Sequence, residues 1–198
     1  LAVEPGLAAR AEAAMLGTTG IDGFDTWAQE LVTTGYLHNH ARMWFASIWI
    51  FTLRLPWELG ADFFLRHLLD GDPASNTLSW RWVGGLHTPG KTYLATADNI
   101  ARNTQGRFHP KGLATIAPPL SGRLAPPPQS APAGHDWGRA DRTALLLHDD
   151  DLNPDWLLAR IRPVATGILS LPNARSPLAP APHIAAFLDG AITDTATR

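Results

Sequence analysis

The sequence has no cysteine and only two tyrosines among its 198 residues, although it has eight tryptophans. The lack of cysteine excludes disulfides, thiolate metal sites and a cysteine nucleophile. A net charge of −2 gives no overall attraction to nucleic acid, so such binding would need a local basic patch. The nearest candidate for a membrane span, residues 43–53, is shorter than the roughly 18 apolar residues required. We therefore expect no membrane partner and a cytoplasmic protein.

The residue pattern divides the chain into three parts. Residues 1–112 have helical periodicity, and the helices are expected at 8–15, 24–31, 36–53, 57–69 and 74–83, with a helical turn near 98–103. Six prolines between positions 118 and 132 indicate an extended linker, which we assign to residues 113–142. Residues 143–198 form a small α/β extension, with strands expected at 143–147 and 164–171 and helices at 154–161 and 183–192. The predicted fold class is mainly α.

Three finer expectations concern the ends and the burial of these elements. Pro56 should occupy the first position of the helix at 57–69, since proline is favoured there. Asn153 should cap the helix at 154–161. The short apolar strand at 143–147 should be buried.

A first polar cluster lies in the long apolar helix expected at 36–53. Asn39 and Arg42 are three residues apart and share one helix face, and Met43 follows on the same side. We expect Arg42 to be buried, and a buried arginine needs a carboxylate partner. Asp70 or Asp72 can provide it.

A second cluster lies on the helix at 74–83. Asp72, Asn76 and Trp80 recur at i, i+4 and i+8 and therefore share one face. If the faces of both clusters meet, they enclose a space suited to an aromatic ring rich in nitrogen and carbonyl groups, such as a flavin. Taken alone, this pattern is more typical of an Arg–Asp pair and an aromatic stripe that pack a helical core.

Four short motifs then occur in register, without a gap, between Gly17 and Trp82. They are G-x-TG at 17–20, TG-x-x-HN-x-x-RM at 34–43 and W-x-x-G-x-x-(Y/F)-F at 57–64. The fourth is LIDGD-x-x-x-N-x-x-x-W-x-W, which is represented by Leu69, Asp70, Gly71, Asp72, Asn76, Trp80 and Trp82. With these motifs, residues 1–110 resemble the FAD-binding helical domain of the DNA photolyase and cryptochrome family. The resemblance implies FAD as cofactor and light-driven electron transfer as chemistry.

The resemblance also implies roles for the matching residues. Those implied to bind FAD are Asn39, Arg42, Asp70, Asp72 and Asn76, with Asn76 facing flavin N5 and Arg42 paired with Asp70. Trp80 would be the proximal electron donor and Trp57 the next link. Those implied to face DNA containing a flipped pyrimidine dimer are Asn39, His40, Met43 and Trp82. Asn39 and Met43 are of the type found with cyclobutane dimers.

The sequence departs from the family pattern in several places. Glu4 stands where the family has a third tryptophan, for which Trp44 or Trp49 could substitute, and His40 replaces the usual arginine. The phosphate-binding T-x-L-S-P stretch and the N-terminal α/β domain of the family are absent from the sequence. Because the first residue is Leu1, we expect the chain to be the C-terminal part of a longer protein.

Two further sets of charged residues were considered as functional sites, one basic and one acidic. Between positions 81 and 123 the chain has one acid, Asp98, against six basic residues, which are Arg81, Lys91, Arg102, Arg107, Lys111 and Arg123. Their position next to Trp82 favours contacts with DNA phosphates. Three consecutive aspartates at 149–151 are interpreted as a solvated turn, and the letters His38-Asn39-His40 are not interpreted as a nuclease motif. No metal is expected.

The resemblance thus implies a deoxyribodipyrimidine photolyase, a carbon-carbon lyase that works as a monomer. Blue light would excite reduced FAD, which splits a pyrimidine dimer in DNA by electron transfer. Two alternatives stay open. One is a cryptochrome-like blue-light photoreceptor without repair activity, and the other is a truncated fragment that does not hold FAD.

Overall fold

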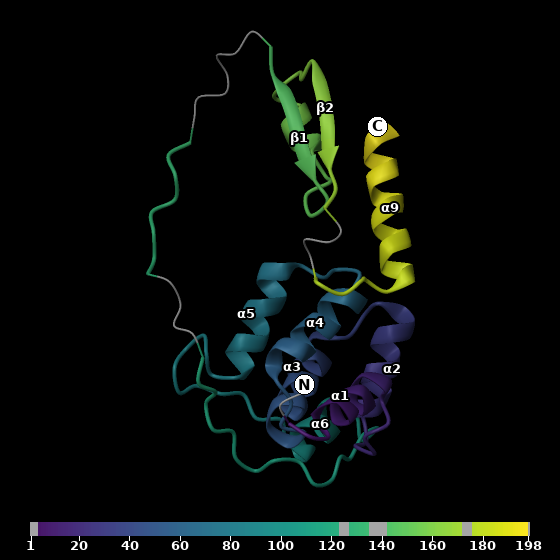
Figure 1. Cartoon of the computed structure of the whole chain (residues 1–198), viewed down its shortest axis with the longest axis vertical. Helices are drawn as coiled ribbons and strands as arrows, with labels where there is room; N and C mark the ends of the chain where they lie inside the picture. The colour runs from purple at the N-terminus through teal and green to yellow at the C-terminus, as the bar shows by residue number, and fades with distance from the viewer. Residues whose placement is uncertain (1–3, 123–126, 135–141, 172–175, 198) are drawn as a thin grey trace.

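The computed structural model describes residues 4–122, 127–134, 142–171 and 176–197 (Figure 1). The regular elements of residues 4–112 are all helices joined by turns and loops. They are α1 (Leu7–Leu16), α2 (Phe24–Thr34), α3 (Asn39–Ser47), the π-helix η1 (Ile48–Thr52), α4 (Trp57–His67), α5 (Pro73–Val83) and α6 (Ala97–Asn103). The rest of the described chain contains β1 (Ala144–His148), α7 (Asp155–Leu158), β2 (Ala165–Leu169) and α9 (Pro182–Thr197). The predicted fold class, mainly α, is confirmed.

Aromatic side chains on α3 and η1 form the centre of the core. Phe45 stacks on Phe24 with ring centroids 4.2 Å apart, and it contacts Phe64 at 5.1 Å. Trp49 on η1 is completely buried and lies 5.9 Å from Phe45. Burial of such rings contributes roughly 1.5–3 kcal/mol for each phenylalanine. The helical bundle is therefore organised around α3 and η1, which also position the pocket described below.

The helix predicted at 36–53 differs from the structure at both ends. It begins only at Asn39, because His38 takes the N-cap position and its side chain accepts a hydrogen bond from the backbone of His40. Its last turn widens into η1, where the N–H of Leu53 donates to the carbonyl of Ile48, five residues back. Apolar periodicity does not distinguish an α-helical turn from a π-helical one at this point, because almost all side chains of the last turn of α3 and of η1 are buried.

The next helix begins at Trp57 as predicted, but Pro56 is the N-cap of α4 and not its first residue. α4 ends at His67, before the predicted end at Leu69. By contrast, α5 runs from Pro73 to Val83, where the sequence placed it, because Asp72 caps its start and Gly84 follows its end.

The extension is a pair of parallel strands with two helices. β1 and β2 pair from Ala144 opposite Ala165 to His148 opposite Leu169. The expectation of a buried strand at 143–147 is wrong, because Leu147 is buried but Leu146 is 70% exposed. Only one face of this two-stranded sheet is covered by the described residues.

The helices of the extension also differ from their predicted bounds. α7 is a single turn that ends at Leu158, and Pro154, not Asn153, takes its N-cap position. α9 is longer than expected and reaches Thr197. Parts of the predicted linker, at 123–126 and 135–141, lie outside the described residues. No helix in the described ranges has the length and apolar character needed to cross a membrane.

Candidate functional site

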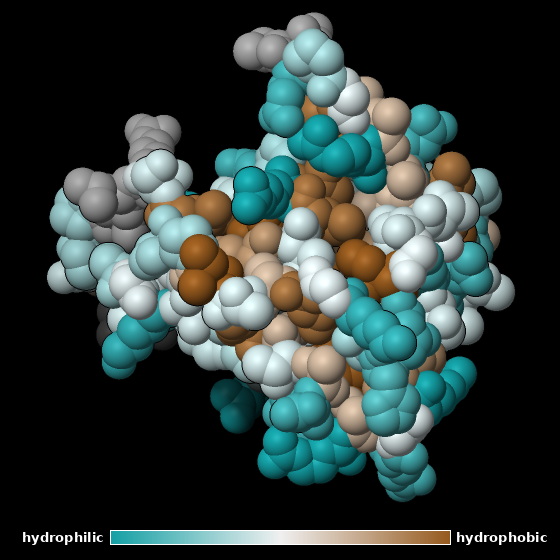
Figure 2. Space-filling view, turned by 90° about the horizontal axis from the view of Figure 1, so that it is seen from below, coloured by the Kyte–Doolittle hydropathy of each residue, from teal (hydrophilic) through white to brown (hydrophobic). Residues whose placement is uncertain are grey.

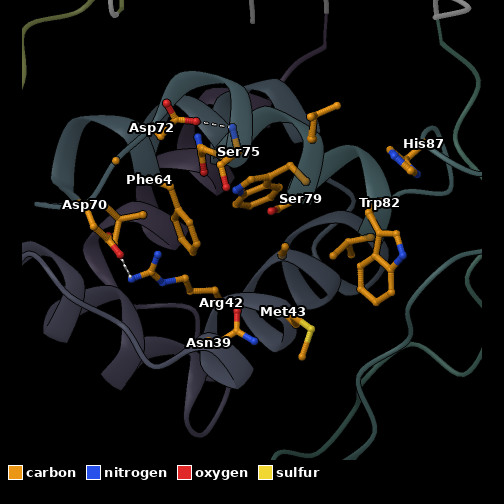
Figure 3. A pocket seen from close by; sticks show the side chains of 17 residues that line it. Asn39, Arg42, Met43, Phe64, Asp70, Asp72, Ser75, Ser79, Trp82 and His87 are labelled. Carbon is orange, nitrogen blue, oxygen red and sulfur yellow. Dashed lines mark hydrogen bonds and ion pairs between the residues drawn. The ribbon is translucent and has the colours of Figure 1, made fainter. Parts of the chain in front are cut away.

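Both polar clusters line one pocket of about 580 Å³ between α3, the end of α4 and α5 (Figure 3). The candidate site residues that line it are Asn39, Arg42, Met43, Asp70, Asp72, Asn76, Trp80 and Trp82. Trp57 and His40 do not line it. His40 instead stacks on Trp44 with centroids 5.7 Å apart, and the ring of Trp57 lies 5.9 Å from the guanidinium of Arg81.

An ion pair between Arg42 and Asp70 lies at one end of the pocket (Figure 3). Nη2 of Arg42 lies 3.0 Å from Oδ2 and 3.1 Å from Oδ1 of Asp70, and Nε donates to the carbonyl of Leu37 at 2.8 Å. The side chains are 25% and 60% exposed, so the expectation of a buried arginine is wrong. Asp70 is the more exposed partner, because the turn after α4 places it at the rim of the pocket. Exposed pairs of this kind are worth at most about 1 kcal/mol of stability.

The N-terminus of α5 is fixed by its own side chains. Oδ1 of Asp72 accepts the backbone N–H of Ser75 at 2.6 Å, and Pro73 provides the first helical residue. One turn further, Nδ2 of Asn76 donates to the carbonyl of Ala61 on α4 at 2.7 Å. This bond uses one of the two N–H donors of the amide and fixes its position, and the carbonyl oxygen of Asn76 remains as an acceptor for a ligand.

A buried tryptophan forms the inner wall of the pocket. Trp80 is 2% exposed, and Phe64 and Trp49 meet its ring edge to face, with centroids 5.1 and 6.2 Å away. A Cβ at Gly60 would lie only 2.2 Å from Cη2 of Trp80. Glycine is therefore required on steric grounds at this position of the W-x-x-G motif, because it lets α4 approach the indole of Trp80.

The opposite, open side of the pocket presents flat and flexible apolar groups. Trp82 is 41% exposed and stacks on Tyr93 with centroids 5.5 Å apart. Burial raises the pKa of Tyr93, so this phenol stays neutral at physiological pH. Met43 and Asn39 lie across from Trp82 in Figure 3. The open side thus combines an aromatic surface with a thioether and an amide.

The predicted basic patch is not part of the pocket. Of the described members of that set, none lines it, and Arg123 lies outside the described residues. Arg107 instead packs its guanidinium over the ring of Phe108, 4.8 Å from the centroid. The basic groups that do line the pocket are Arg42 and His87.

Sequence reasoning missed Ser79 and His87 as lining residues. Ser79 is three residues beyond Asn76 on the same helix, so its spacing was a usable signal. His87 had no such signal. It reaches the pocket because the chain folds back after α5, where the N–H groups of Leu86 and His87 both donate to the carbonyl of Arg81.

The pocket suits a flavin in size and in chemistry. Its volume is within the range of about 300–1,000 Å³ typical of small-molecule sites. Phe64, Leu68 and Trp80 provide apolar walls. The amide of Asn39 and the hydroxyl of Ser79 make no side-chain hydrogen bond within the described part of the chain, so they are available to a ligand.

The candidate metal cluster does not change the expectation of a site without metal. His148, Asp149 and Asp150 can bring their ligand atoms within 4.8 Å of one another, but two of the three are exposed. Nδ1 of His148 is also occupied by the N–H of Asp150 at 3.3 Å. An exposed strand-end turn of this kind needs no ion.

Comparison with known proteins gives the family. The family model described as the FAD binding domain of DNA photolyase matches residues 6–112. The deoxyribodipyrimidine photo-lyase of Streptomyces griseus is 44% identical over 72 residues, which are 36% of this chain and 16% of that protein. That of Thermus thermophilus is 38% identical over 97 residues, 48% of this chain and 22% of the relative. That of Vibrio cholerae is 31% identical over 96 residues, 48% and 20% of the two chains.

No solved structure shows a significant match. The aligned part of this chain spans about a fifth of the length of the curated relatives, between 16% and 22%. The matched region contains every residue that lines the pocket. FAD is the cofactor that domains of this family bind. Because the family model covers more than half of the chain, this protein belongs to the photolyase and cryptochrome family through its FAD-binding domain.

Proposed function

We propose that this chain is part of a light-dependent flavoprotein that holds FAD in the pocket between α3 and α5 and repairs pyrimidine dimers in DNA. The observation that carries the proposal is the joint placement of Arg42, Asn76 and Trp80 around one cavity. The cation and the hydrogen-bond acceptor match the negative charge and the protonated ring nitrogen of a reduced flavin, and the indole is an electron donor for a flavin that is not yet reduced.

Bound FAD would supply the electron that cleaves the dimer. The chain's own residues hold and surround it. Arg42 offers a positive charge that Asp70 partly balances, and the carbonyl of Asn76, held by Ala61, accepts a hydrogen bond from a ring N–H. Asp72 keeps its place at the start of α5 through Ser75 and lines the same cavity.

In this proposal Trp80 is the first electron donor for photoreduction and Trp57 the next. Trp80 is screened from water, which protects a charged intermediate from side reactions. The tryptophan that packs directly on Trp80 is Trp49, whereas Trp57 lies against Arg81. Trp49 is therefore a candidate for a further donor next to Trp80; the sequence had offered Trp44 or Trp49 as substitutes for the third tryptophan of the family.

The open side of the pocket is the proposed site of the DNA lesion. The stacked pair of Trp82 and Tyr93 offers a flat surface to a flipped base, and base stacking on such rings is worth about 1–3 kcal/mol. Asn39 and Met43 face the same opening (Figure 3). His40, one residue along, would contact the phosphate backbone. We further propose a cytoplasmic monomer in which residues 1–112 form the FAD-binding part.

The test begins with a titration of the purified chain with FAD, followed by flavin fluorescence and visible absorbance. Asn76→Ala should weaken FAD binding by about two- to tenfold, the effect of one hydrogen bond. Asn103→Ala is the matched control, because Nδ2 of Asn103 also donates to a backbone carbonyl, that of Asn99 at 2.9 Å, but on α6. Equal effects of both variants would refute the assignment of the pocket.

Illumination then separates the alternatives. Loss of cyclobutane dimers from irradiated DNA supports the repair function. Flavin photoreduction without dimer loss would instead support the cryptochrome-like photoreceptor. A folded chain that binds no FAD at any concentration would identify a fragment whose cofactor site needs more of the protein, and it would refute the proposal for this chain.

A further inference from the structure

The last helix, α9, is attached to the rest of the chain near both of its ends. Before its start, the hydroxyl of Ser176 donates a hydrogen bond to Oδ1 of Asp62 on α4, and the N–H of Ala181 donates to another carbonyl of α4 at 2.9 Å. Near its end, the hydroxyl of Thr195 donates to the carbonyl of Leu152, in the loop after β1, at 3.1 Å. These bonds fix the place of α9 beside the two strands (Figure 1).

Between the two attachments, one face of α9 is open. Positions 187, 188, 191, 194 and 195 recur at intervals of three and four residues and therefore share one side of the helix. Among the described residues of α9, Ile184 alone is buried, whereas Phe187 is 50% exposed. Helices in proteins gain most of their stability from the packing of an apolar face. The face that contains Phe187 and Leu188 is only partly packed.

This face of α9 lines a groove of about 600 Å³. The groove is also lined by the turn after β1, with Asp149 and Asp150, and by the start of α7, with Asp155. A third side is the turn between α4 and α5, where Leu69 is 37% exposed. The groove therefore joins apolar side chains of the extension to one of the helical part.

The groove is strongly negative. Six aspartates line it, which are Asp70, Asp72, Asp149, Asp150, Asp155 and Asp194, and none of its described lining residues is Lys, Arg or His. A cleft lined by charges of one sign attracts opposite charges and repels like ones. The phosphates of nucleic acid and of anionic lipids are therefore disfavoured in the groove, and a cationic occupant is favoured.

The apolar residues decide which kind of cation fits. An inorganic cation takes oxygen ligands and gains nothing from the side chains of Phe187 and Leu188. A peptide with both apolar and basic side chains uses the whole groove. An amphipathic helix places its apolar stripe in such a groove and its charged residues along the edges. Its spacing of three and four residues also matches the spacing on α9.

We propose that the groove between α9, the end of β1 and the α4–α5 turn is a docking site for a basic amphipathic helix of another protein. Apolar side chains of that helix pack on Phe187 and Leu188, and its lysines or arginines pair with Asp149 and Asp155. The inference goes beyond the proposed function, because docking requires neither FAD nor DNA.

Fluorescence anisotropy with the full chain, in the absence of FAD, tests the docking site. The probe is a labelled synthetic helix of about 14 residues, built from leucine on one face and lysine on the other. We expect saturable binding with a Kd in the micromolar range at about 0.15 M salt. A peptide of equal charge with serine in place of leucine should bind at least about tenfold more weakly, because it buries no apolar surface.

Two variants test the two kinds of contact. Phe187→Ser should weaken binding of the leucine peptide at least about fivefold, because the exposed half of the ring no longer packs on it. Leu171→Ser is the matched control, since Leu171 is 53% exposed but does not line the groove. Asp155→Asn should weaken binding by about two- to fivefold, and less at high salt. Its control is Asp189→Asn, an exposed position of α9 outside the groove.

Three outcomes would overturn the docking site. The first is equally tight binding of the serine peptide, which would show attraction by charge alone. The second is a leucine peptide that binds Asp155→Asn as tightly as the parent at low salt; this variant decides alone if circular dichroism shows that Phe187→Ser has lost helix. The third is a dimer of the parent chain, measured by sedimentation, that Phe187→Ser converts into a monomer, since a second copy would then occupy the groove. Because FAD is absent throughout, the FAD titration remains a separate test of the proposed function.

Discussion

Substitution of Gly60 by alanine tests the geometry of the pocket wall most directly. The added methyl group would lie 2.2 Å from Cη2 and 2.5 Å from Cζ3 of Trp80, and 3.0 Å from Cε2 of Trp49. Favourable contacts between carbon atoms occur at about 3.5–4.0 Å. Trp80 or α4 must therefore move by roughly 1.5 Å to restore such a contact, although both indoles are almost inaccessible to solvent.

The magnitude follows from two opposing effects. Overpacking of a filled core costs about 1–3 kcal/mol. Replacement of glycine by alanine inside a helix contributes about 0.5–1 kcal/mol of stability. We expect Gly60→Ala to lower the free energy of unfolding by about 1–2 kcal/mol.

Gly190→Ala is the matched control. Gly190 lies inside α9, and a Cβ there would meet nothing within 4 Å. It should therefore show only the helix effect and no loss of stability.

Urea unfolding, followed by circular dichroism and tryptophan fluorescence, measures the difference between the two variants. A titration with FAD should show weaker binding by Gly60→Ala, because the displaced indole of Trp80 narrows the pocket. A Gly60→Ala variant as stable as the parent, with unchanged FAD affinity, would show that the approach of α4 to Trp80 does not constrain the site. It would refute the steric interpretation of the motif.

Two further variants test the polar rim. Arg42→Ala should weaken FAD binding yet lower the free energy of unfolding by no more than about 1 kcal/mol, because its pair with Asp70 is partly exposed; unfolding and FAD titrations on one preparation check this, and a loss of several kcal/mol would contradict it. Asp72→Ala should lower the free energy of unfolding by about 1 kcal/mol through loss of the cap on Ser75, whereas Asp72→Asn should retain most of it. Equal losses in both Asp72 variants, measured by urea unfolding, would show that the negative charge and not the cap is responsible.

Elements with chemical signals at their ends were predictable from the sequence. α5 has a capping aspartate, a proline at its first position and a glycine after its last residue, and its bounds are as predicted to within one residue. α2 begins at Phe24 as predicted and continues to Thr34, before Gly35. By contrast, η1 has no such signal. Its five residues are all hydrophobic or β-branched, so their pattern fits an α-helix equally well.

How deeply a side chain is buried was less predictable from the sequence than which charged residues form an ion pair. The need of Arg42 for a carboxylate led to Asp70 or Asp72, and the structure pairs it with Asp70. That reasoning assumed a buried pair, however, whereas the turn after α4 leaves Asp70 mostly exposed. The strand β1 shows the same limit. Its apolar residues predict burial, but a sheet of two strands leaves Leu146 uncovered.

The hydrogen bond between Ser176 and Asp62 shows which features periodicity cannot reveal. The pocket is built by neighbouring helices whose spacing repeats every three or four residues, so a short motif contains most of its geometry. Ser176 and Asp62 are 114 residues apart and are joined across a proline-rich stretch, and neither belongs to a repeating pattern. Their contact depends on where the chain returns, which is a property of tertiary structure. A motif can therefore identify the pocket in a related sequence, whereas a contact such as that of Ser176 with Asp62 has to be established from the fold of each chain.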